Sequence, residues 1–507
     1  MPAQHPVVIG VDSSTQSTKA AVVDTTTGAL LAVGRAPHTV DGTGGARESD
    51  PGQWWTALVE AVGRALKEAA VPPSAVTGIA VAGQQHGLVV LDATGRPLRP
   101  ALLWNDTRSA PQAAGLTAAL GGPGPWLART GSQPVASMTA AKWRWLRENE
   151  PATADATAAI RLPHDFLTER LTGIGVTDPG DASGTCWYST ADHAYDPDLL
   201  ALLGLDPAVL PTVAPTGAAR VGTLTPAAAE ALGLPGTVAV AAGTGDNMAA
   251  AVGLGLGGAG LLDHPVVSLG TSGTVFAATR TRPAAPGLAG FAAADGTYLP
   301  LGCTLNCTLA VDRFADLFGL HREDTAPSGD GVVVLPYLDG ERTPDLPHAT
   351  GLLTGLRHTT TPNAILTAAY EGAVFTVLRA LDELLTACGA DPADPAVRDR
   401  PLRLVGGGAR GRAWARTVRR LSGRPVVVPA ATELVALGAA ALAAGAATGD
   451  DPVALATAWN AGAGDLLPPL TRDRETWDRI ASVLDAAAPA APAVPASDAE
   501  GARTWLL

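Results

Sequence analysis

Cysteine is scarce in this chain, with four cysteines among 507 residues. They do not form pairs of the CxxC kind, which argues against a zinc site built on thiolates. Four cysteines in so long a chain also cannot supply the dense disulfide framework of a small secreted domain. We therefore expect reduced core side chains at Cys186, Cys303, Cys307 and Cys388.

Lysine is almost missing, since the chain contains only Lys19, Lys67 and Lys142, and arginine carries nearly all of the positive charge. Acidic residues are in excess, giving a net charge of −13 and an isoelectric point near 5.1. This balance argues against non-specific binding of nucleic acid or of an anionic membrane. It leaves room for a small anionic ligand, because one site can be positive on an acidic protein.

Long hydrophobic runs are also missing. The longest apolar stretch, residues 434–447, is interrupted by glycine and is too short to cross a bilayer. The first residues lack the basic and apolar pattern of a signal peptide. We therefore expect a soluble cytoplasmic protein. With 507 residues and 47% apolar content, the chain should fold around more than one core.

Two short stretches share the same spacing of hydroxyl residues. Residues 7–24 and 266–276 each read as two β-branched strands joined by a tight turn of glycine, serine and threonine. Such turns direct N–H and O–H donors into one concavity, which suits phosphate oxygens. The alignment pairs Thr15 with Thr271, Thr18 with Thr274, and Asp12 with Ser268.

The repeated turn suggests a duplicated domain with a nucleotide held between the two halves. The second stretch has a serine at the position that aligns with Asp12. Asp12 would therefore break the symmetry of the two turns by binding a metal ion.

Strand-like and helix-like segments alternate in both halves, which is typical of an α/β protein with helices covering its sheets. The Ala/Pro-rich residues 486–496 read as a flexible linker or tail. The expected strands cover residues 76–82, 88–91, 238–242, 332–336, 402–405 and 426–428. The expected helices begin near residues 51, 137, 362 and 433, with a further helix around Trp414.

The sequence Gly243-Thr244-Gly245-Asp246-Asn247-Met248 follows a strand-like run. In open α/β sheets, ligands bind at the carboxyl ends of the strands. Asp246 is therefore a candidate general base that accepts a proton from a substrate hydroxyl during phosphoryl transfer. The alternative is an ordinary N-cap aspartate of the following helix.

Two further motifs suit a polyhydroxylated ligand. Residues 83–87 form a turn in which Gln85 and His86 offer an amide and an imidazole. Residues 104–108 place the aromatic Trp104 beside the carboxylate of Asp106 and a guanidinium. The alternatives are an ordinary hairpin turn for the first motif and a surface ion pair of aspartate and arginine for the second.

A glycine triplet, residues 406–408, lies between an expected strand and the next helix. Backbone can approach a ribose or a flat base there, and the helix N-terminus favours negative charge. On its own the triplet reads as a plain turn, and its interest comes from lying in the same half as the second hydroxyl-rich turn.

Together these motifs resemble the FGGY family of carbohydrate kinases, within the actin-like ATPase superfamily. Residues 137–149 fit the first family signature, and residues 351–371 fit the second except at Ala364, where a polar residue is usual. The resemblance implies two ribonuclease H-like domains with a cleft between them. We place a sugar-binding domain at residues 1–254, a nucleotide-binding domain at 255–450 and an extension at 451–507.

Within this family the chain is most similar to the xylulokinases. That similarity implies phosphorylation of D-xylulose to D-xylulose 5-phosphate, with ATP and Mg²⁺. Asp246 would then be the base, Asn247, Gln85 and His86 would contact the ketose, and Asp12 would be linked to Mg²⁺ and to activity. Many members have methionine where this chain has Gln85.

The resemblance also implies the remaining contacts and leaves alternatives open. Another sugar or polyol such as ribulose, gluconate or glycerol is one alternative, and an actin- or chaperone-type ATPase is another. A homodimer is one possible state, and no nucleic-acid or membrane partner is expected. The implied ATP contacts are Thr15, Thr18, Gly270, Thr271, Thr274, Gly407 and Gly408, and the further sugar-binding candidates are Trp104 and Asp106.

Overall fold

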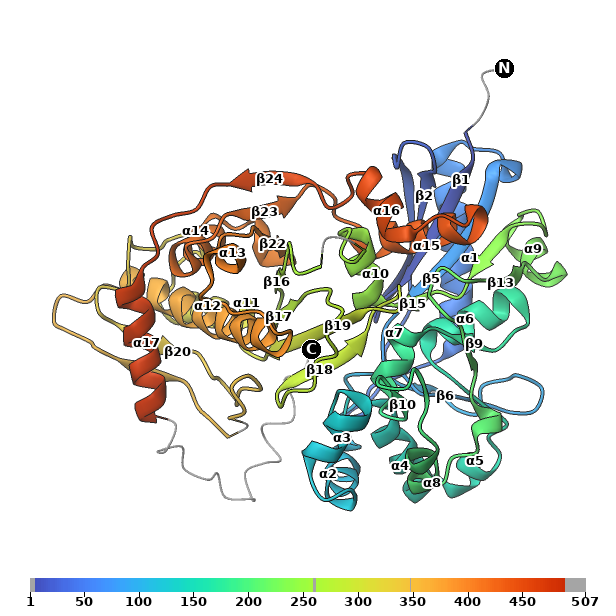
Figure 1. Ribbon diagram of the computed structural model, residues 1–507, viewed down its shortest axis with the longest axis horizontal. Helices are drawn as coiled ribbons and strands as arrows, with labels where there is room; N and C mark the ends of the chain where they lie inside the picture. The colour runs from blue at the N-terminus through green and yellow to red at the C-terminus, as the bar shows by residue number, and fades with distance from the viewer. Residues whose placement is uncertain (1–4, 259–260, 347, 488–507) are drawn as a thin grey trace.

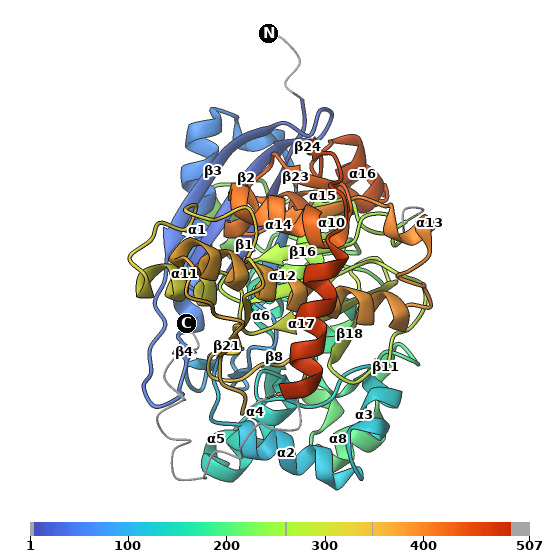
Figure 2. The same ribbon diagram turned by 90° about the vertical axis from the view of Figure 1, so that its left-hand side faces the viewer.

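The chain forms two α/β halves that lie side by side, each built on a seven-stranded sheet (Figures 1 and 2). The computed structural model describes residues 5–258, 261–346 and 348–487. Most of the Ala/Pro-rich segment that we predicted to be a tail lies outside these residues.

The N-terminal sheet is mixed, with β2 antiparallel to β1 and with β5 and β14 parallel to it. Short strand β15 pairs with the end of β5. The order is β3 (Leu30–Pro37), β2 (Ser17–Asp24), β1 (Val7–Ser13), β5 (Val76–Gly83), β14 (Ala239–Ala241) and β13 (Arg220–Thr223), with β15 (Thr244–Gly245) beside β5.

The C-terminal sheet repeats this arrangement. Strand β17 is antiparallel to β16, while β22 and β23 continue in parallel on the other side. The predicted duplicated α/β fold is therefore confirmed. The order is β18 (Leu288–Ala292), β19 (Tyr298–Thr304), β17 (Gly273–Phe276), β16 (Val266–Leu269), β22 (Leu402–Val405), β23 (Val426–Pro429) and β24 (Gly464–Leu467).

Helices cover both sheets. In the first half they are α1 (Pro51–Ala69), α2 (Ala110–Ala119), α3 (Pro123–Thr130), α4 (Thr139–Asn149), α5 (Pro151–Asp155), α6 (Pro163–Thr172), α7 (Pro179–Ala182), α8 (Pro197–Leu203), α9 (Pro226–Leu232) and α10 (Asp246–Gly253). In the second half they are α11 (Thr308–Leu317), α12 (Pro362–Ala387), α13 (Pro395–Arg398), α14 (Arg412–Ser422), α15 (Leu434–Thr448), α16 (Pro452–Ala458) and α17 (Arg474–Ala487).

Short strands pair outside the two main sheets. These pairs are β4 (Glu48–Ser49) with β7 (Ala101–Leu102), β6 (Val89–Leu91) with β8 (Ala159–Arg161), β9 (Val176–Thr177) with β12 (Thr212–Val213), β10 (Tyr188–Ser189) with β11 (Ala194–Tyr195), and β20 (Val333–Leu335) with β21 (Leu352–Thr354).

Local sequence signals placed most of these elements correctly. The Asp50 side chain caps α1 by accepting from the backbone N–H of Gly52 at 2.9 Å, as the Asp-Pro pair predicts. Helix α4 begins at Thr139, two residues after its expected start. The turn at residues 83–87 is not a hairpin, because β6 pairs with β8 rather than with β5.

The long helix α12 forms the centre of the second core. It is apolar and long enough to cross a membrane, but 94% of its most apolar window is buried inside the protein. It packs against β20, α11 and α14. Figure 1 shows it as an orange helix within the second half. The apolar character of α12 is therefore explained by core packing.

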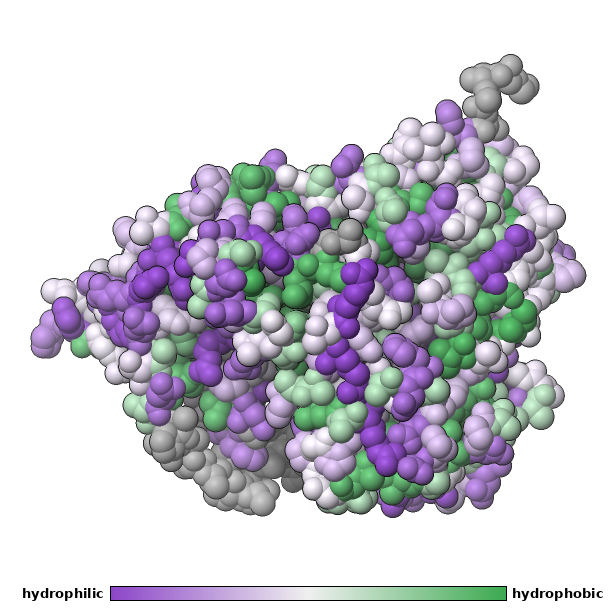
Figure 3. Space-filling model, in the orientation of Figure 1, coloured by the Kyte–Doolittle hydropathy of each residue, from purple (hydrophilic) through white to green (hydrophobic). Residues whose placement is uncertain are grey.

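On the face drawn in Figure 3, polar and apolar residues are intermixed.

Helix α15 lies in the chain between β23 and β24 of the second sheet but packs on the first sheet, against β1 and β5. The contact is close because Gly10 faces the helix backbone, where a Cβ would lie 1.9 Å from the carbonyl oxygen of Ala436. The small side chains of α15, mostly alanine, allow this approach. The two halves are thus joined through a shared packing layer.

We expect Gly10→Ala to lower the free energy of unfolding by about 1–3 kcal/mol or more, because the added methyl group must push α15 away from β1. Urea unfolding measures this change. Gly63→Ala is the matched control, since Gly63 lies in α1 with open space around its Cα. That control should stabilise the protein by about 0.5–1 kcal/mol. Equal stability of Gly10→Ala and wild type would contradict the packing described here.

Candidate active site

Strand pairing brings the two candidate catalytic segments to the same edge of the first sheet. Ala82 on β5 lies opposite Asp12 on β1 and opposite Thr244 on β15. The next row aligns Gly83 with Ser13 and with Gly245. Asp246 follows directly as the first residue of α10. The carboxyl ends of these parallel strands therefore gather Asp12 and Asp246 at one edge.

The corresponding edge of the second sheet faces this one. Glu433 comes after β23, at the N-terminus of α15, and accepts from Nζ of Lys19 at 2.7 Å. Lys19 lies on β2 opposite Asp12, and its Nζ is 3.7 Å from Oδ2 of that residue. The ion pair of Lys19 with Glu433 thus joins the two halves beside the first hydroxyl-rich turn.

The carboxyl group of Asp246 is half-buried and electrostatically perturbed. Burial, together with the carboxylates of Asp12 and Asp181, raises the pKa of Asp246 to about 7. Gly245 is the N-cap of α10, and Asp246 itself accepts from the backbone N–H of Asn247 at 2.8 Å. The alternative N-cap role for Asp246 is therefore wrong, and the group has the proton affinity that suits a general base near neutral pH.

Two amide side chains extend this edge. Nδ2 of Asn247 donates to Oε1 of Gln85 at 2.8 Å, which links α10 to the turn after β5. Nε2 of Gln85 is buried and has no hydrogen-bond partner among the described residues. An unpaired buried donor is costly, so it indicates room for an acceptor from a ligand. The structure thus brings Gln85, Asn247 and Asp246 together.

His86 lies next to these amides in a left-handed backbone conformation with φ of 65°. Its ring stacks at a tilt on Phe291 of β18, with centroids 5.5 Å apart, so it touches the second half of the chain. Gly184 makes room for the ring, because a Cβ there would lie 2.3 Å from Nδ1. Burial and the charges of Lys142 and Arg342 lower the pKa of His86 to about 3. The imidazole is therefore neutral.

The 104–108 motif divides into an exposed and a buried part. Trp104 is 43% exposed, and its Nε1 donates to Oγ1 of Thr15 at 3.1 Å, which joins it to the first turn. Asp106 is buried and accepts from the Arg108 side chain and from the backbone N–H of Arg47 at 2.9 Å. Its carboxylate already has protein donors, so direct sugar binding by Asp106 stays a prediction.

The first hydroxyl-rich turn does not match the second residue by residue. Thr18 pairs with Ser13 and their hydroxyl oxygens lie 3.2 Å apart, whereas Thr274 pairs with Ser268. In the sequence alignment, the partner of Thr18 would have been Asp12. The hairpins therefore differ by one residue of register. Thr18 is fully buried, so its hydroxyl supports the turn from within.

The second turn lies at the carboxyl edge of the second sheet. Thr308 of α11 donates to the carbonyl oxygen of Gly270, from its backbone N–H at 3.1 Å and from its hydroxyl at 2.8 Å. Thr271 and Ser272 are part-exposed or exposed, while Thr274 lies in β17. Thr308 therefore fixes the backbone of the turn at Gly270, while Thr271 and Ser272 stay accessible to a ligand.

The glycine triplet joins the second turn. Strand β22 pairs with β16 as far as Ser268 and Val405, so Gly407 and Gly408 follow at the same edge as Gly270. A Cβ at Gly408 would lie 2.9 Å from Cβ of Leu269, whereas Gly407 has open space around it. The predicted nucleotide contacts of the second half therefore lie together.

A buried ionic cluster, which we did not predict, supports the turn that carries Asp246. His164 and Asp181 lie 2.7 Å apart between Nδ1 and Oδ2, and Nε2 of His164 is 3.2 Å from Oδ1 of Asp165. Thr244 donates to Asp178 at 2.7 Å. Burial alone would lower the pKa of His164, but Asp165, Asp181 and Asp178 raise it to about 9. The cluster therefore holds one protonated imidazole among three carboxyl groups.

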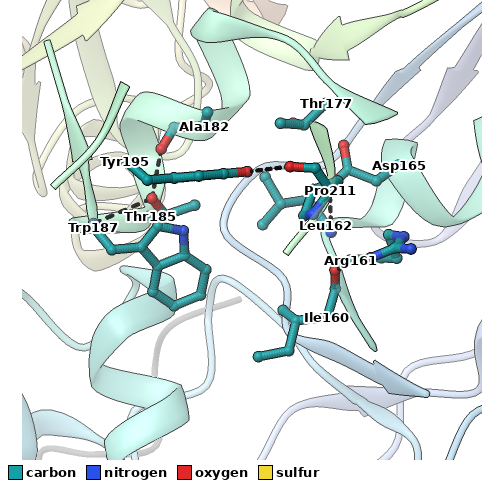
Figure 4. Close-up of a pocket in the computed structure, with 10 residues that line it drawn as sticks. All are labelled: Ile160, Arg161, Leu162, Asp165, Thr177, Ala182, Thr185, Trp187, Tyr195 and Pro211. Carbon is teal, nitrogen blue, oxygen red and sulfur yellow. Dashed lines mark hydrogen bonds between the residues drawn. The ribbon is translucent and has the colours of Figure 1, made fainter. Parts of the chain in front are cut away.

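Asp165 also lines a small cavity of about 10 Å³ in the first half, close to the room that one water molecule needs. Figure 4 shows the cavity between Tyr195, whose hydroxyl donates to the carbonyl of Pro211 at 2.8 Å, and the Asp165 carboxyl group. The cavity is too small for a sugar, so the sugar site must lie elsewhere.

The carboxylate of Asp12 fits a magnesium ion that is shared with a ligand. It is buried, and Oδ1 accepts from the Ser14 hydroxyl at 2.5 Å. The described residues contain no group of three or more side chains able to cage a metal. Mg²⁺ in phosphoryl-transfer sites uses one or two carboxylates together with phosphates and water, so this sparse donor set suits it.

Comparison with known proteins identifies the family. The model of the N-terminal domain of the FGGY family of carbohydrate kinases matches residues 7–253, and that of the C-terminal domain matches residues 266–447. The chain belongs to the FGGY family of carbohydrate kinases. It is therefore a sugar kinase, and the family resemblance predicted from the sequence signatures is confirmed.

Relatives of this carbohydrate kinase match it over nearly their full length. The xylulose kinase of Streptomyces rubiginosus is 57% identical over 96% of this chain and 98% of its own. That of Streptomyces coelicolor is 58% identical, with the same coverage. The crystal structure of xylulose kinase from Bifidobacterium adolescentis has a TM-score of 0.80 and 33% identity, and covers 94% of this chain and 99% of its own.

The pKa of Asp246 leads to a prediction about pH. A base must be deprotonated to act, so kcat/KM for the sugar should rise with pH and level off above about 7. An unperturbed aspartate would instead give a flat profile down to about pH 4. A profile measured between pH 5 and 9 decides between them, and a flat profile would contradict the raised pKa.

Proposed function

We propose that this carbohydrate kinase transfers the γ-phosphoryl group of ATP to D-xylulose and forms D-xylulose 5-phosphate. The similarity to the two Streptomyces xylulose kinases supports the choice of sugar. The observation that carries the mechanism is the carboxyl group of Asp246, which has a pKa of about 7 beside two amides and a neutral imidazole.

Asp246 acts as the general base in this proposal. The terminal hydroxyl oxygen of the ketose attacks the γ-phosphorus and its proton passes to the Asp246 carboxylate. A new O–P bond forms, the bond from the γ-phosphorus to the bridging oxygen breaks, and ADP leaves. The raised pKa of Asp246 makes it basic enough to accept this proton as the bond forms.

The ketose is held by groups on the first half of the chain. Nε2 of Gln85 offers its unpaired donor, Asn247 fixes that amide, and the neutral ring of His86 can donate or accept. Trp104 supplies an aromatic surface near the first turn. Asp106 holds the segment of Trp104 through Arg108 and Arg47, and its direct contact with the sugar stays a prediction.

ATP is held between the hydroxyl-rich turns. Thr15 and the Gly270–Thr274 segment donate to the phosphates, and Gly407 and Gly408 lie beside the adenosine. Thr18 supports the first turn through Ser13. Asp12 holds Mg²⁺, which neutralises phosphate charge when it is bound.

We further propose that the kinase works in the cytoplasm.

The division of the chain near residues 254 and 450 stays a prediction. The packing of α15 on the first sheet means that the second segment contributes a helix to the first half. Dimerisation also stays a prediction.

We expect wild-type enzyme to consume ATP fastest with D-xylulose in a coupled assay across ribulose, gluconate, glycerol and xylulose. Faster turnover with another of these substrates would replace the proposed sugar. ATP consumption that no sugar stimulates would contradict a sugar kinase altogether.

The variant Asp246→Asn tests the proposed base. It should bind ATP and sugar but lose roughly 10²–10⁴-fold in kcat, the range expected for general base catalysis.

We expect Asp12→Asn to raise the Mg²⁺ concentration needed for half-maximal activity by roughly tenfold or more, because one carboxylate ligand is lost. The Kd for the sugar, measured without nucleotide, should stay near the wild-type value. Magnesium titrations of the initial rate measure the effect. An unchanged Mg²⁺ requirement would remove Asp12 from the metal site.

A further inference from the structure

The segment Glu341-Arg342-Thr343 is held rigidly beside the second hydroxyl-rich turn. Glu341 is almost fully buried and accepts from the backbone N–H of Leu305 at 2.5 Å and from the Asn306 side chain at 3.1 Å. Leu305 and Asn306 directly follow β19. A buried carboxylate with several donors fixes its own backbone firmly.

The other side of Arg342 is fixed as well. The Thr343 hydroxyl donates to the carbonyl oxygen of Cys303 at 2.9 Å. Cys303 lies opposite Thr274 in the β17–β19 ladder, and the following residue lies opposite Gly273. The backbone of Arg342 is therefore tied on both sides to the strand next to the second turn.

The side chain of Arg342 is exposed and forms no ion pair among the described residues. The positive charge of Arg342 acts to lower the pKa of two groups near the site. These are the imidazole of His86 in the first half and the thiol of Cys303 in the second. Because Thr343 is bonded to Cys303, which lies opposite Thr274, the backbone of Arg342 lies beside the second turn.

The neighbouring cations are already engaged. Lys19 forms its ion pair with Glu433 at 2.7 Å. Lys142 is buried and donates to the carbonyl oxygens of Ala136, at 3.1 Å, and Ser137. Since the facing edge supplies the carboxyl groups of Asp12 and Asp246, an unpaired cation is needed there to balance an incoming phosphate.

We propose that Arg342 is a further catalytic residue that binds the phosphoryl group while it passes from ATP to the sugar. This inference rests on the proposed kinase reaction. A planar guanidinium suits two phosphate oxygens at once, and charge on the transferred group is spread over its three equatorial oxygens. The hydrogen bonds of Glu341 and Thr343 fix the backbone of Arg342, so only the exposed side chain itself must be ordered when the contact forms.

The test compares Arg342→Gln with wild type, using whichever sugar wild type phosphorylates. We expect kcat to fall by roughly 10²–10³-fold, as for loss of a transition-state donor. The KM for ATP should change by less than about threefold, because the contact forms mainly in the transition state. Arg342→Lys keeps the positive charge but lacks the planar guanidinium that can bond two phosphate oxygens, so it should recover part of the lost kcat.

Binding provides a second readout. Calorimetry with ADP, aluminium fluoride and the sugar should show tight binding to wild type and weak binding to Arg342→Gln, while ADP alone binds both equally. Arg357→Ala is the matched control, an exposed arginine of the same half without an ion pair among the described residues. It should match wild type in both assays.

Two results would overturn the assignment. One is a kcat of Arg342→Gln within about threefold of wild type. The other is a defect confined to the KM for the sugar, which would make Arg342 a sugar contact instead. Because the substrate is chosen from wild-type activity, a wrong sugar leaves this test intact. A wild-type chain without any sugar kinase activity would refute the proposed function and, with it, the role of Arg342.

Discussion

The parallel pairing of β5 with β1 on one side and with β15 on the other is the constraint on which the site depends. It places Asp12 and Thr244 opposite the same residue, Ala82, so that Asp246 emerges at the edge where Asp12 already lies. Burial of Asp246 raises its pKa to about 7, and the neighbouring carboxylates of Asp12 and Asp181 add to this rise because like charges disfavour each other's ionisation. Strand register thus sets the chemistry of the base before any ligand arrives.

The second half supplies what this acidic edge lacks. Its hydroxyl-rich turn and the glycines after β22 offer backbone and hydroxyl donors, and Arg342 adds a positive charge that forms no ion pair within the described residues. The two halves are joined by the Lys19–Glu433 ion pair and by α15, which packs on the first sheet although it lies in the chain between two strands of the second. A duplicated fold has thereby acquired unlike halves. In the proposed mechanism, the first half binds the sugar and holds the base, and the second turn supplies donors to the phosphates of the nucleotide.

The elements with strong local signals could be predicted from the sequence, and the pairings between distant segments could not. Asp50-Pro51 marks the start of α1, and Thr361-Pro362 marks the start of α12, because capping is local. The turn that carries the proposed base, residues 243–248, also has a local signal in its glycines and its preceding strand. The sequence alignment could not show that the two hairpins differ by one residue of register, which puts Thr18 opposite Ser13 but Thr274 opposite Ser268. The cluster around His164 and the mounting of Arg342 depend on tertiary contacts across 14 or more residues, for which the sequence has no periodic signal.

The most direct test of this account is a crystal structure with ADP, aluminium fluoride, Mg²⁺ and the sugar bound. The account predicts that the reacting hydroxyl lies within about 2.6–3.2 Å of an Asp246 carboxyl oxygen, on the side of the fluoride that faces away from ADP. Asp12 should lie on the metal side of the same group. A bound sugar whose hydroxyls all lie beyond hydrogen-bond reach of Asp246, with the aluminium fluoride in place, would contradict it.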